Sequence, residues 1–391
     1  MIKDQKISVI GAGIGGLATA LALRLRGADV QVFEQAEVLG EVGAGLQISP
    51  NGLAVLKALG VGPQFRALGV RAKAVDLCDY RQGRLVCRLD IARYVPELEY
   101  SFIHRADLAQ LLYEACLAKG VEFEFSQTVI DVGGSDAPQI TTQSGLFCAP
   151  DFVVGADGVK SGMRRVLGNE SAPRFSGQVA WRAIVPNICN HPDHAMVNMA
   201  PRRHMVSYPL RDRSGVNLVL VQERSQWAEE GWAQRDDPHN VHAAFADFGG
   251  MAKLLLSGLD TVHLWGLFLH PVASCWGQGQ MALVGDAAHP TLPFLAQGAT
   301  MALEDAWVLA HSLDTQRPLK ERLTAYQTRR KPRAERAVRT AAGNAWKYHI
   351  SAPPLRWAAH SSMRIIAATA PRRLLGQFDW LYRHDVTMHG G

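Results

Sequence analysis

The 391-residue chain lacks several features that mark secreted, membrane-spanning or nucleic-acid-binding proteins. Its six cysteines are scattered without a close pair, which argues against a disulfide framework or a metal site. No run of about 20 apolar residues suggests a membrane span, and the sequence has no internal repeat or low-complexity segment. A net charge of +5 is too small for a nucleic-acid-binding surface. We therefore expect a cytoplasmic globular protein with no metal, no nucleic-acid partner and no membrane partner.

The first fifty residues carry a dinucleotide-binding pattern. Residues 6–10 (KISVI) predict a strand, and the following GAGIGG places Gly11, Gly13 and Gly16 in G-x-G-x-x-G spacing before a helical segment. The first glycine permits a tight turn, the second admits a pyrophosphate, and the third lets the helix pack on the strand. Glu34 ends the next strand, at a suitable distance to accept hydrogen bonds from a ribose. A signal peptide is excluded because glycines break the apolar run. The pattern leaves NAD and FAD open.

Two later segments favour FAD. In DFVVGADGVKSGMRRVLG (151–168), a buried strand runs into Asp157 at the start of a D-G-x-x-S-x-x-R spacing. In LVGDAAHPTLPFLAQGATMALEDA (283–306), a strand ends at Asp286, and a helical apolar period begins after Gln297. An extended FAD needs an acceptor for its ribityl hydroxyls, which Asp286 could supply. The later helix would direct the positive end of its dipole at whatever lies before it.

Together these segments resemble the fingerprints of single-component (class A) FAD-dependent aromatic hydroxylases. GAGLQISPN (43–51) and FIHRADL (102–108) are also similar to segments of that family, and FDWLYRHD (378–385) resembles the salicylate and 3-hydroxybenzoate hydroxylase branch. The resemblance implies bound FAD, NADH or NADPH as a transient reductant, and O₂ as co-substrate. In the implied cycle, NAD(P)H reduces FAD, O₂ adds to give a flavin hydroperoxide, and its distal oxygen attacks an electron-rich aromatic ring. No second glycine-rich unit is present for the nicotinamide, so the choice of reductant stays open.

The resemblance also assigns cofactor contacts. Asp286 resembles the ribityl-binding aspartate, Arg105 resembles the flavin-contacting arginine, and the helix start after Gln297 would face the flavin pyrimidine edge. The alternatives are an ordinary loop and helix cap at that helix start, and a surface ion pair for Arg105. His289 is expected to tie its loop down rather than act as a base. The residues expected to bind FAD are Gly11, Gly13, Gly15, Gly16, Glu34, Gln35, Gly45, Arg105, Asp157, Asp286, Gly298 and Ala299.

The expected fold class is α/β, with a discontinuous Rossmann-like FAD-binding domain (the GR2-type flavin hydroxylase fold), an antiparallel β-sheet substrate domain and a helical C-terminal tail. Runs rich in β-branched and aromatic residues at 179–186, 204–211, 216–223 and 263–270 predict the sheet over the flavin. The tail could form a membrane-surface helix, but we expect it to pack on the protein's own surface or on a dimer partner. Monomer and homodimer both stay open. The predicted domains are 1–73, 98–176 and 275–345 (FAD-binding), 74–97 and 177–274 (substrate), and 346–391 (tail).

The candidate catalytic residues are His204, Tyr208 and Gln297. Alternation along HMVSYPLR puts His204 and Tyr208 on one face of a strand, so both could face one pocket. Tyr208 matches a tyrosine position that recurs in the family. His204 is a candidate general base, with a surface histidine as the alternative, and Gln297 could touch substrate or hydroperoxide. The pair Trp181-Arg182 resembles a structural pair of the family. The residues expected to line the substrate pocket are Gln47, Tyr208, Pro293 and Phe294.

The sequence therefore predicts a NAD(P)H- and O₂-dependent FAD monooxygenase that hydroxylates a small aromatic acid or phenol resembling salicylate or hydroxybenzoate. Gln47 and Phe294 stand where a 6-hydroxynicotinate hydroxylase would carry histidines, which argues against a pyridine substrate. Two alternatives stay open. One is a FAD-dependent reductase, or a hydroxylase of a larger apolar substrate, on the same fold. The other is a non-catalytic flavin-binding module, which would show no substrate-stimulated consumption of NAD(P)H.

Overall fold

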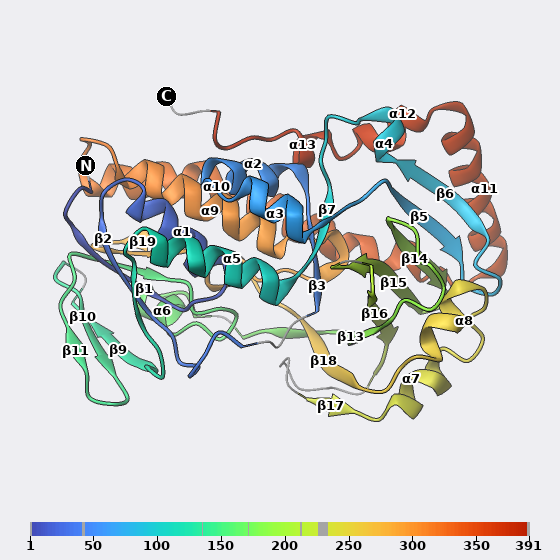
Figure 1. Ribbon diagram of the computed structural model, residues 1–391, viewed down its shortest axis with the longest axis horizontal. Helices are drawn as coiled ribbons and strands as arrows, with labels where there is room; N and C mark the ends of the chain where they lie inside the picture. The colour runs from blue at the N-terminus through green and yellow to red at the C-terminus, as the bar shows by residue number, and fades with distance from the viewer. Residues whose placement is uncertain are drawn as a thin grey trace.

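A central six-stranded sheet organises the first part of the fold (Figure 1). The computed structural model describes residues 2–40, 44–134, 136–170, 172–211, 213–225 and 234–388. The strands are parallel except for a terminal β19–β20 hairpin. Every residue from Ile7 to Ile10 in β1 is buried, as expected for a parallel strand covered on both faces. In spatial order the strands are β19 (Gly277–Gln278), β20 (Met281–Leu283), β12 (Phe152–Gly155), β1 (Lys6–Ile10), β2 (Asp29–Phe33) and β8 (Glu122–Glu124).

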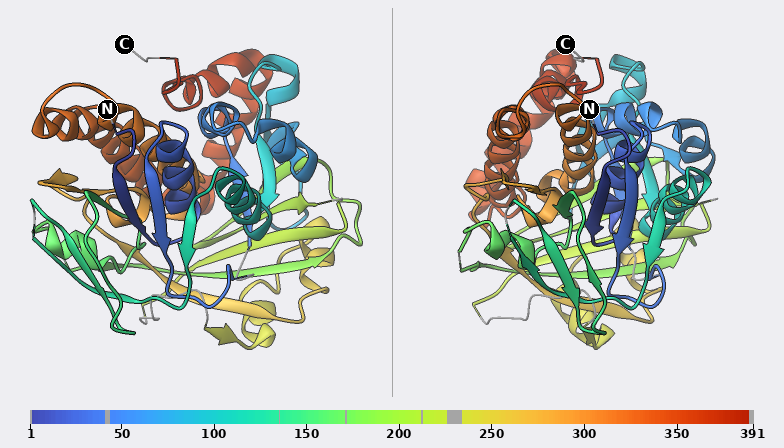
Figure 2. Two further views of the ribbon diagram at one scale, coloured as in Figure 1. Left: turned by 60° about the vertical axis from the view of Figure 1, so that its left-hand side comes forward. Right: turned by 90° about the vertical axis from the view of Figure 1, so that its left-hand side faces the viewer.

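Helices pack on this sheet, and a small antiparallel sheet lies on its other side (Figures 1 and 2). Helix α1 is buried almost throughout and packs between the sheet, α5 and α9. The helices of this part are α1 (Ile14–Arg24), α2 (Pro50–Ala58), α3 (Gly62–Leu68), α5 (Arg105–Ala118), α6 (Gly162–Val166), α9 (Gly298–Leu313) and α10 (Leu319–Tyr348). The small sheet contains β9 (Val129–Gly133), β10 (Gln139–Thr142) and β11 (Phe147–Cys148).

A second, eight-stranded sheet lies beside the first part of the fold. It is antiparallel except for the parallel pair β14 and β5. Alternation along β15 sends Met205 toward the helices α7 (Pro238–Ala244) and α8 (Met251–Leu256), while His204 and Tyr208 face the opposite way. In spatial order the strands are β17 (Arg235–Asp236), β18 (Val262–Leu269), β13 (Arg174–Pro186), β16 (Gly215–Glu223), β15 (Arg203–Leu210), β14 (His194–Ala200), β5 (Ala74–Asp79) and β6 (Leu85–Asp90).

A three-stranded sheet joins the two parts, and the remaining helices are short or C-terminal. This sheet contains β3 (Gly45–Ile48), β7 (Ser101–His104) and β4 (Val70–Arg71). The short helices are α4 (Ile91–Tyr94), η1 (Gly285–Ala287) and η2 (Pro293–Leu295), and the tail forms α11 (Pro353–Thr369), α12 (Pro371–Gly376) and α13 (Asp379–Tyr382). The expected α/β class with a second antiparallel sheet and a helical tail is confirmed. The domain boundaries stay a proposal, supported by the inclusion of β5 and β6 in the eight-stranded sheet.

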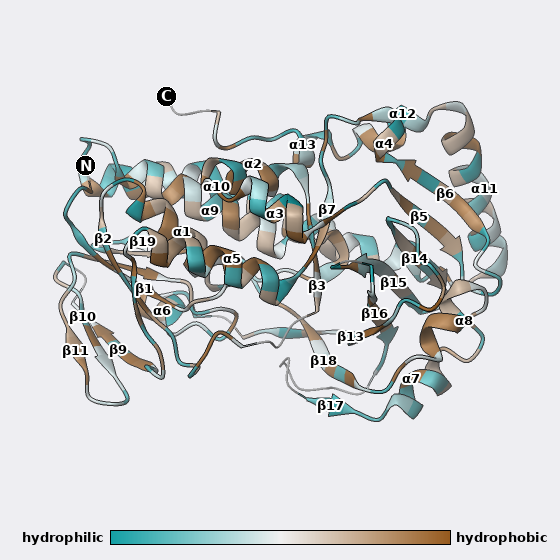
Figure 3. Ribbon diagram, in the orientation of Figure 1, coloured by the Kyte–Doolittle hydropathy of each residue, from teal (hydrophilic) through white to brown (hydrophobic). Residues whose placement is uncertain are grey.

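The tail packs on the protein's own surface along only part of its length. Met363 and Ala367 of α11 contact the largely hydrophobic strand β6, which Figure 3 colours mainly brown, and Leu381 of α13 is fully buried. The outer side of α11 instead exposes Trp357 and Ile365 to solvent. The tail therefore packs on the protein's own surface through one side of α11 and through α13, and packing of the outer side of α11 on a dimer partner stays a prediction. No helix in the described ranges is both long and apolar enough to cross a membrane.

Candidate functional site

The glycine-rich loop between β1 and α1 has the tight geometry of a phosphate-binding turn. Gly11 has a φ of +103°, and a Cβ there would stand 2.5 Å from the Ala156 carbonyl oxygen. A Cβ on Gly16 would stand 1.8 Å from the Gly11 carbonyl oxygen, so the helix start packs directly on the turn. Gly13 differs, because no atom lies within 4 Å of the place its Cβ would take. The open position is therefore the one at which a pyrophosphate would approach the helix N-terminus.

Glu34 is fixed at the end of β2 by backbone amides. The Ala12 amide donates to its Oε2 atom at 2.7 Å, and the Ala36 amide donates to its Oε1 atom at 2.9 Å. The carboxylate is thus tied to the glycine-rich loop, and each oxygen keeps a further lone pair for a ribose hydroxyl. Gln35 follows as an exposed residue. Both positions are compatible with the cofactor-binding role predicted for them.

The Asp157 segment supports the loop that carries Asp286. Asp157 accepts hydrogen bonds from the Ser161 hydroxyl at 2.6 Å and the Met163 amide at 3.1 Å, which fixes the start of α6. Arg164 then donates to the carbonyl oxygens of Ala287 and Ala288 at 3.2 and 3.3 Å. The sequence segments that resemble family fingerprints are, in chain order, the glycine-rich loop (first), the Asp157 segment (second) and the Asp286 segment (third). The second and third fingerprints are therefore joined through the buried Arg164. In this arrangement Asp157 already has a structural role, and its contact with FAD stays a prediction.

The first and third fingerprints meet at α9. Cβ atoms built on Gly15 and on Gly285 would stand 3.2 and 3.1 Å from the same methyl group, that of Ala302. Gly285 also has a φ of +60°, which favours glycine. Side chains at either position would press the loops away from α9. The three fingerprint loops consequently converge, as binding of one elongated cofactor requires.

Asp286 and Arg105 lie close to each other at this junction. Asp286 is exposed although its neighbours Gly285 and Ala287 are buried, and no hydrogen bond to its carboxylate is found in the described part of the chain. The surrounding protein raises the pKa of Asp286 by desolvation, which the charges of His289 and Arg105 partly oppose. Arg105 begins α5, and its amide donates to the Ala44 carbonyl oxygen at 3.2 Å. An exposed, unbonded acceptor at this place fits a ribityl hydroxyl.

The start of α9 is available to an anionic group. No side chain caps this helix, and its first turn carries no acidic residue, so the N–H groups of its first turn stay available. Gly298 and Ala299 stand at that start and are partly exposed. Together with Gly13, Glu34 and Asp286, this helix end forms a set of donors and acceptors that fits FAD.

Gln297 is held inside the protein at the start of α9. Its Nε2 atom donates to the Ser49 hydroxyl at 2.9 Å, and its Oε1 atom accepts from Asn51 at 3.4 Å. Only 1% of Gln297 is exposed. This geometry makes Gln297 a residue that positions α9. Contact with a substrate would require its side chain to leave the network, so the catalytic role stays a prediction.

A buried cluster of charged residues joins α9 to α10 and to the loop that carries Asp286. The His289 Nε2 atom lies 2.5 Å from Asp305 Oδ2, which also accepts from the Gly285 amide at 3.0 Å. Arg330 of α10 bonds both Asp305 and Glu304. Burial alone would raise the pKa of Glu304, but the arginines Arg330 and Arg333 outweigh it and lower the pKa to about 2. His289 therefore tethers the Asp286 loop, as the sequence led us to expect.

Tyr208 lies at the centre of the sheet face that points toward the three-stranded sheet. It is buried, and its ring stacks on Phe102 at a centroid distance of 4.8 Å. Gly45 is required for this approach, because a Cβ there would stand 2.6 Å from the Tyr208 ring. Burial raises the pKa of Tyr208, while Arg182, Gln47 and Asn217 oppose the shift. Gln47 also accepts from the Tyr100 hydroxyl at 2.8 Å. Gly43, the first residue of the segment 43–51 that resembles the family, lies outside the described residues.

Arg182 and its neighbour Trp181, which resemble a structural pair of the family, lie on opposite faces of β13. Trp181 does have a structural place, since it is fully buried and donates to Asp236 at 2.6 Å. Arg182 points to the opposite side of β13, with its guanidinium carbon 4.5 Å from the Trp265 ring centroid. Burial lowers the pKa of Arg182 to about 9. The nearby charge of Arg105 adds to this shift, and Tyr208 opposes it. Neighbouring side chains of a strand point to opposite faces, so the sequence could have indicated that Arg182 faces away from the buried Trp181.

His204 begins a hydrogen-bonded chain that reaches the surface. Its Nδ1 atom lies 2.7 Å from His349 Nε2, and His349 Nδ1 lies 2.9 Å from Glu223 Oε1. His204 is only 2% exposed, so the alternative of a surface histidine is wrong. The ring centroids of His204 and Phe294 lie 5.6 Å apart. At the other end of the chain of hydrogen bonds, 31% of the Glu223 side chain is exposed. Burial and the neighbouring His349 lower the pKa of His204 well below its usual value. Pro293 precedes Phe294 and is partly exposed.

The fold and the converging loops define a FAD-binding flavoprotein, and comparisons with known proteins specify its family. The family described as FAD binding domain matches residues 4–341. The chain is 34% identical over 362 residues to 3-amino-4-hydroxybenzoate 2-monooxygenase of Streptomyces cremeus, covering 90% of each. It is 34% identical over 324 residues to 3-hydroxybenzoate 6-hydroxylase of Klebsiella oxytoca, covering 80% of this chain and 81% of the relative. Klebsiella pneumoniae HpxO complexed with FAD and uric acid shares the fold, with a TM-score of 0.83, 24% identity and 95% coverage of both chains.

The chain belongs to the family of single-component FAD-dependent aromatic hydroxylases. This finding confirms the expected family and the expected cofactor FAD. It also confirms the enzyme class, a FAD-dependent aromatic monooxygenase.

Proposed function

We propose that the protein hydroxylates a small aromatic acid carrying a phenolic hydroxyl group, such as salicylate or a hydroxybenzoate, with NADH or NADPH and O₂. The activities for which the two relatives are named support an aromatic acid of this kind. The observation that carries the proposal is the arrangement of Arg182, His204 and Tyr208. All three lie on one face of the eight-stranded sheet, as the register of β13, β16 and β15 requires.

Arg182 would bind the carboxylate of the substrate. Its pKa is lowered because burial disfavours the charged guanidinium, and a bound carboxylate would oppose that effect by stabilising the charged form. An arginine can offer two parallel N–H donors to a carboxylate, which fixes the plane of the aromatic ring. Stacking on Trp265 holds the guanidinium in place before the substrate arrives.

His204 would accept the phenolic proton. The Glu223 carboxylate can only accept a hydrogen bond, so His349 Nδ1 must donate to it, and His349 Nε2 then accepts from His204 Nδ1. This order leaves a lone pair on His204 Nε2, the form that a general base requires. A proton taken up there could leave through His349 to Glu223 at the surface. Deprotonation makes the aromatic ring a stronger nucleophile.

Bound FAD would supply the redox chemistry, taking electrons from the nicotinamide and using them to activate O₂. Glu34, Asp286 and the N-terminus of α9 would hold it, with Arg105 beside Asp286. Tyr208 would contact the substrate from the roof of the pocket, opposite Phe294 and Gln47. The cytoplasmic location and the choice between monomer and homodimer stay predictions.

The test is a substrate screen on the FAD-loaded protein. Salicylate, 3-hydroxybenzoate, 4-hydroxybenzoate and 3-amino-4-hydroxybenzoate are each added with NADH or NADPH, and oxidation of the nicotinamide is followed. Products are then examined for oxygen from ¹⁸O₂. Stimulated oxidation with labelled product is expected for at least one acid. A product without label, or the absence of stimulation by every acid, would contradict the proposal.

A further inference from the structure

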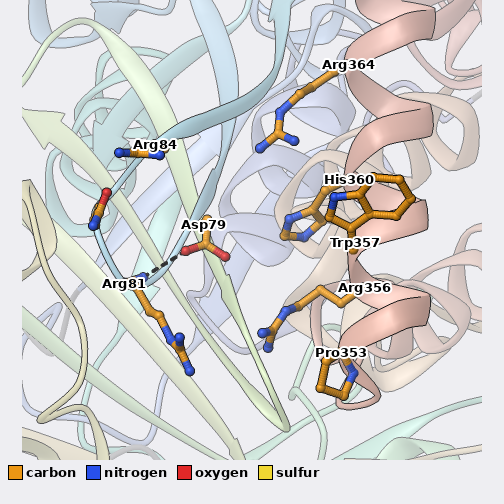
Figure 4. Close-up of a pocket in the computed structure, with 9 residues that line it drawn as sticks. Asp79, Arg81, Arg84, Pro353, Arg356, Trp357, His360 and Arg364 are labelled. Atoms are coloured by element: carbon orange, nitrogen blue, oxygen red, sulfur yellow. Dashed lines mark hydrogen bonds between the residues drawn. The ribbon is translucent and has the colours of Figure 1, made fainter.

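Four arginines converge on a pocket that the proposed chemistry does not use. The pocket measures about 330 Å³ and lies between the β5–β6 hairpin and helix α11, at the β6 edge of the eight-stranded sheet (Figure 4). Arg81 and Arg84 come from the hairpin, whereas Arg356 and Arg364 come from α11. Figure 4 shows these side chains surrounding the space between the two elements, with Asp79 and His360 between them.

The charge of this pocket is unbalanced. Asp79 is the one carboxylate among the lining residues, and it accepts a hydrogen bond from the Arg81 backbone amide at 3.1 Å. No ion pair between any of the four guanidinium groups and a carboxylate is found over the described ranges. Arg81 and Arg356 instead lie over the Tyr80 ring, at 5.7 and 5.6 Å from its centroid. Four positive charges therefore face one negative charge.

Arg356 supplies a second, independent indication of a missing anion. Its Nη1 atom is buried and has no hydrogen-bond partner. A buried donor without an acceptor is destabilising, and a rotation of the Arg356 side chain toward the pocket would let an oxygen atom of a bound anion accept from it. The N-terminal turn of α11 also lines the pocket through Pro353, so the positive end of this 17-residue helix adds to the attraction.

We propose that this pocket binds the phosphate group of a small phosphorylated molecule. A single carboxylate has two oxygens and is satisfied by one arginine, whereas a phosphate offers three or more oxygens and a higher charge to several guanidinium groups. The pocket is also larger than phosphate alone needs and falls within the size range of small-molecule sites. Trp357, which is 72% exposed at the edge of the pocket, would contact the organic part of the ligand. This site is independent of the hydroxylation reaction.

The test uses the FAD-loaded full-length protein with pyrophosphate as the probe. Binding is followed by calorimetry and by tryptophan fluorescence, with Trp357→Phe identifying the signal of that residue. We expect saturable binding that Arg84→Gln combined with Arg364→Gln weakens at least about tenfold. The matched control, Arg235→Gln combined with Arg339→Gln, removes the same charge from exposed positions outside the pocket and should change the affinity less than about twofold. Thermal unfolding of each variant verifies that the fold is retained.

Further probes identify the source of the phosphate group. ADP tests a soluble phosphate ester, and sedimentation with phosphatidylcholine vesicles containing phosphatidic acid tests a lipid phosphate. Binding of either that depends on Arg84 and Arg364 supports the proposal. An equal loss of affinity in the control variant would show attraction to overall charge only and would overturn it. The absence of saturable binding by pyrophosphate, ADP and vesicles would overturn it as well.

Discussion

His204 Nδ1 lies 2.7 Å from His349 Nε2, although 145 residues separate the two histidines in the chain. His349 in turn lies 2.9 Å from Glu223, so the buried His204 is connected to a partly exposed carboxylate. Burial lowers the pKa of both histidines. Each is therefore neutral near pH 7, and both can pass a proton on without holding a buried charge.

Glu223→Gln should slow hydroxylation by an order of magnitude, which corresponds to about 1.4 kcal/mol in the barrier. An amide can turn its N–H₂ group toward His349, and this would reverse the hydrogen-bond order along the chain. Single-turnover rates, their pH profile and the solvent isotope effect should all change, while FAD affinity does not. Arg202→Gln is the control, because it removes the ion pair to Glu223 Oε2 and leaves the contact with His349 in place. An unchanged pH profile in Glu223→Gln, with hydroxylation intact, would remove the relay without affecting the proposed reaction.

Tyr208→Phe should lower the fraction of NAD(P)H oxidation that yields hydroxylated product. The ring and its stacking on Phe102 are kept, and only the hydroxyl facing Gln47 and Asn217 is lost. The expected loss of stability is about 1 kcal/mol. Coupling is measured as product formed per nicotinamide oxidised, with Tyr113→Phe in α5 as the control. Normal coupling in Tyr208→Phe would exclude a direct role for the hydroxyl.

Much of the fold could be predicted because its signals are local. The runs at 179–186, 204–211, 216–223 and 263–270 fall on β13, β15, β16 and β18, since alternation and turn residues are visible in a short window. Strand β14 was missed. Its parallel pairing with β5 joins residues about 120 positions apart, as in Ala195 and Val75, and no local pattern encodes it.

The residues of the candidate site also differ in whether a local sequence pattern could reveal them. The glycines, Glu34 and Asp286 belong to motifs of fixed spacing and could be found in the sequence. His349 and Glu223 could not, because their relation to His204 depends on how the end of α10 packs against β15 and β16. Trp181 has the structural place expected for it, whereas the substrate contact of its neighbour Arg182 is a proposal. The surroundings of Gln297 could not be predicted either, since sequence alone cannot reveal that its amide group is hydrogen-bonded to Ser49 and Asn51.

Asp286→Ala should weaken FAD binding ten- to a hundredfold. The expected loss corresponds to the roughly 1.5–3 kcal/mol of hydrogen bonds to a charged group. The carboxylate has no partner in the described ranges, so its removal should not unfold the loop that Asp305 and Arg164 hold. Affinity is measured by titrating the FAD-free protein with FAD and following flavin fluorescence. Asp260→Ala is the control at a position outside the fingerprint loops. Full retention of FAD by Asp286→Ala would contradict the ribityl contact.

Arg182→Gln should raise the KM for an aromatic acid at least about tenfold, because a charge-assisted bidentate contact is lost. The same variant should change the KM for a phenol without a carboxyl group much less. The comparison of the two substrates is the measurement, since damage to the fold would affect both. Arg174→Gln, at the other end of β13, is the control. Equal increases in KM for acid and phenol would show that Arg182 does not recognise the carboxylate.

Glu304 should make the stability of the protein sensitive to acid. Its pKa is about 2 in the folded protein against a usual 4.5, so the carboxylate contributes its full stabilisation above pH 4.5. That contribution to the free energy of unfolding, about 3 kcal/mol from the difference in pKa, is lost as the pH falls from 4.5 toward 2.

Glu304→Gln leaves Arg330 and Arg333 without this partner and should cost about 3–5 kcal/mol of stability at neutral pH. Thermal unfolding midpoints between pH 7 and pH 3 should then fall less steeply for Glu304→Gln than for the unaltered protein, whereas Glu335→Gln on α10 should follow the unaltered protein. Parallel curves for Glu304→Gln and the unaltered protein would show that this carboxylate does not titrate with unfolding.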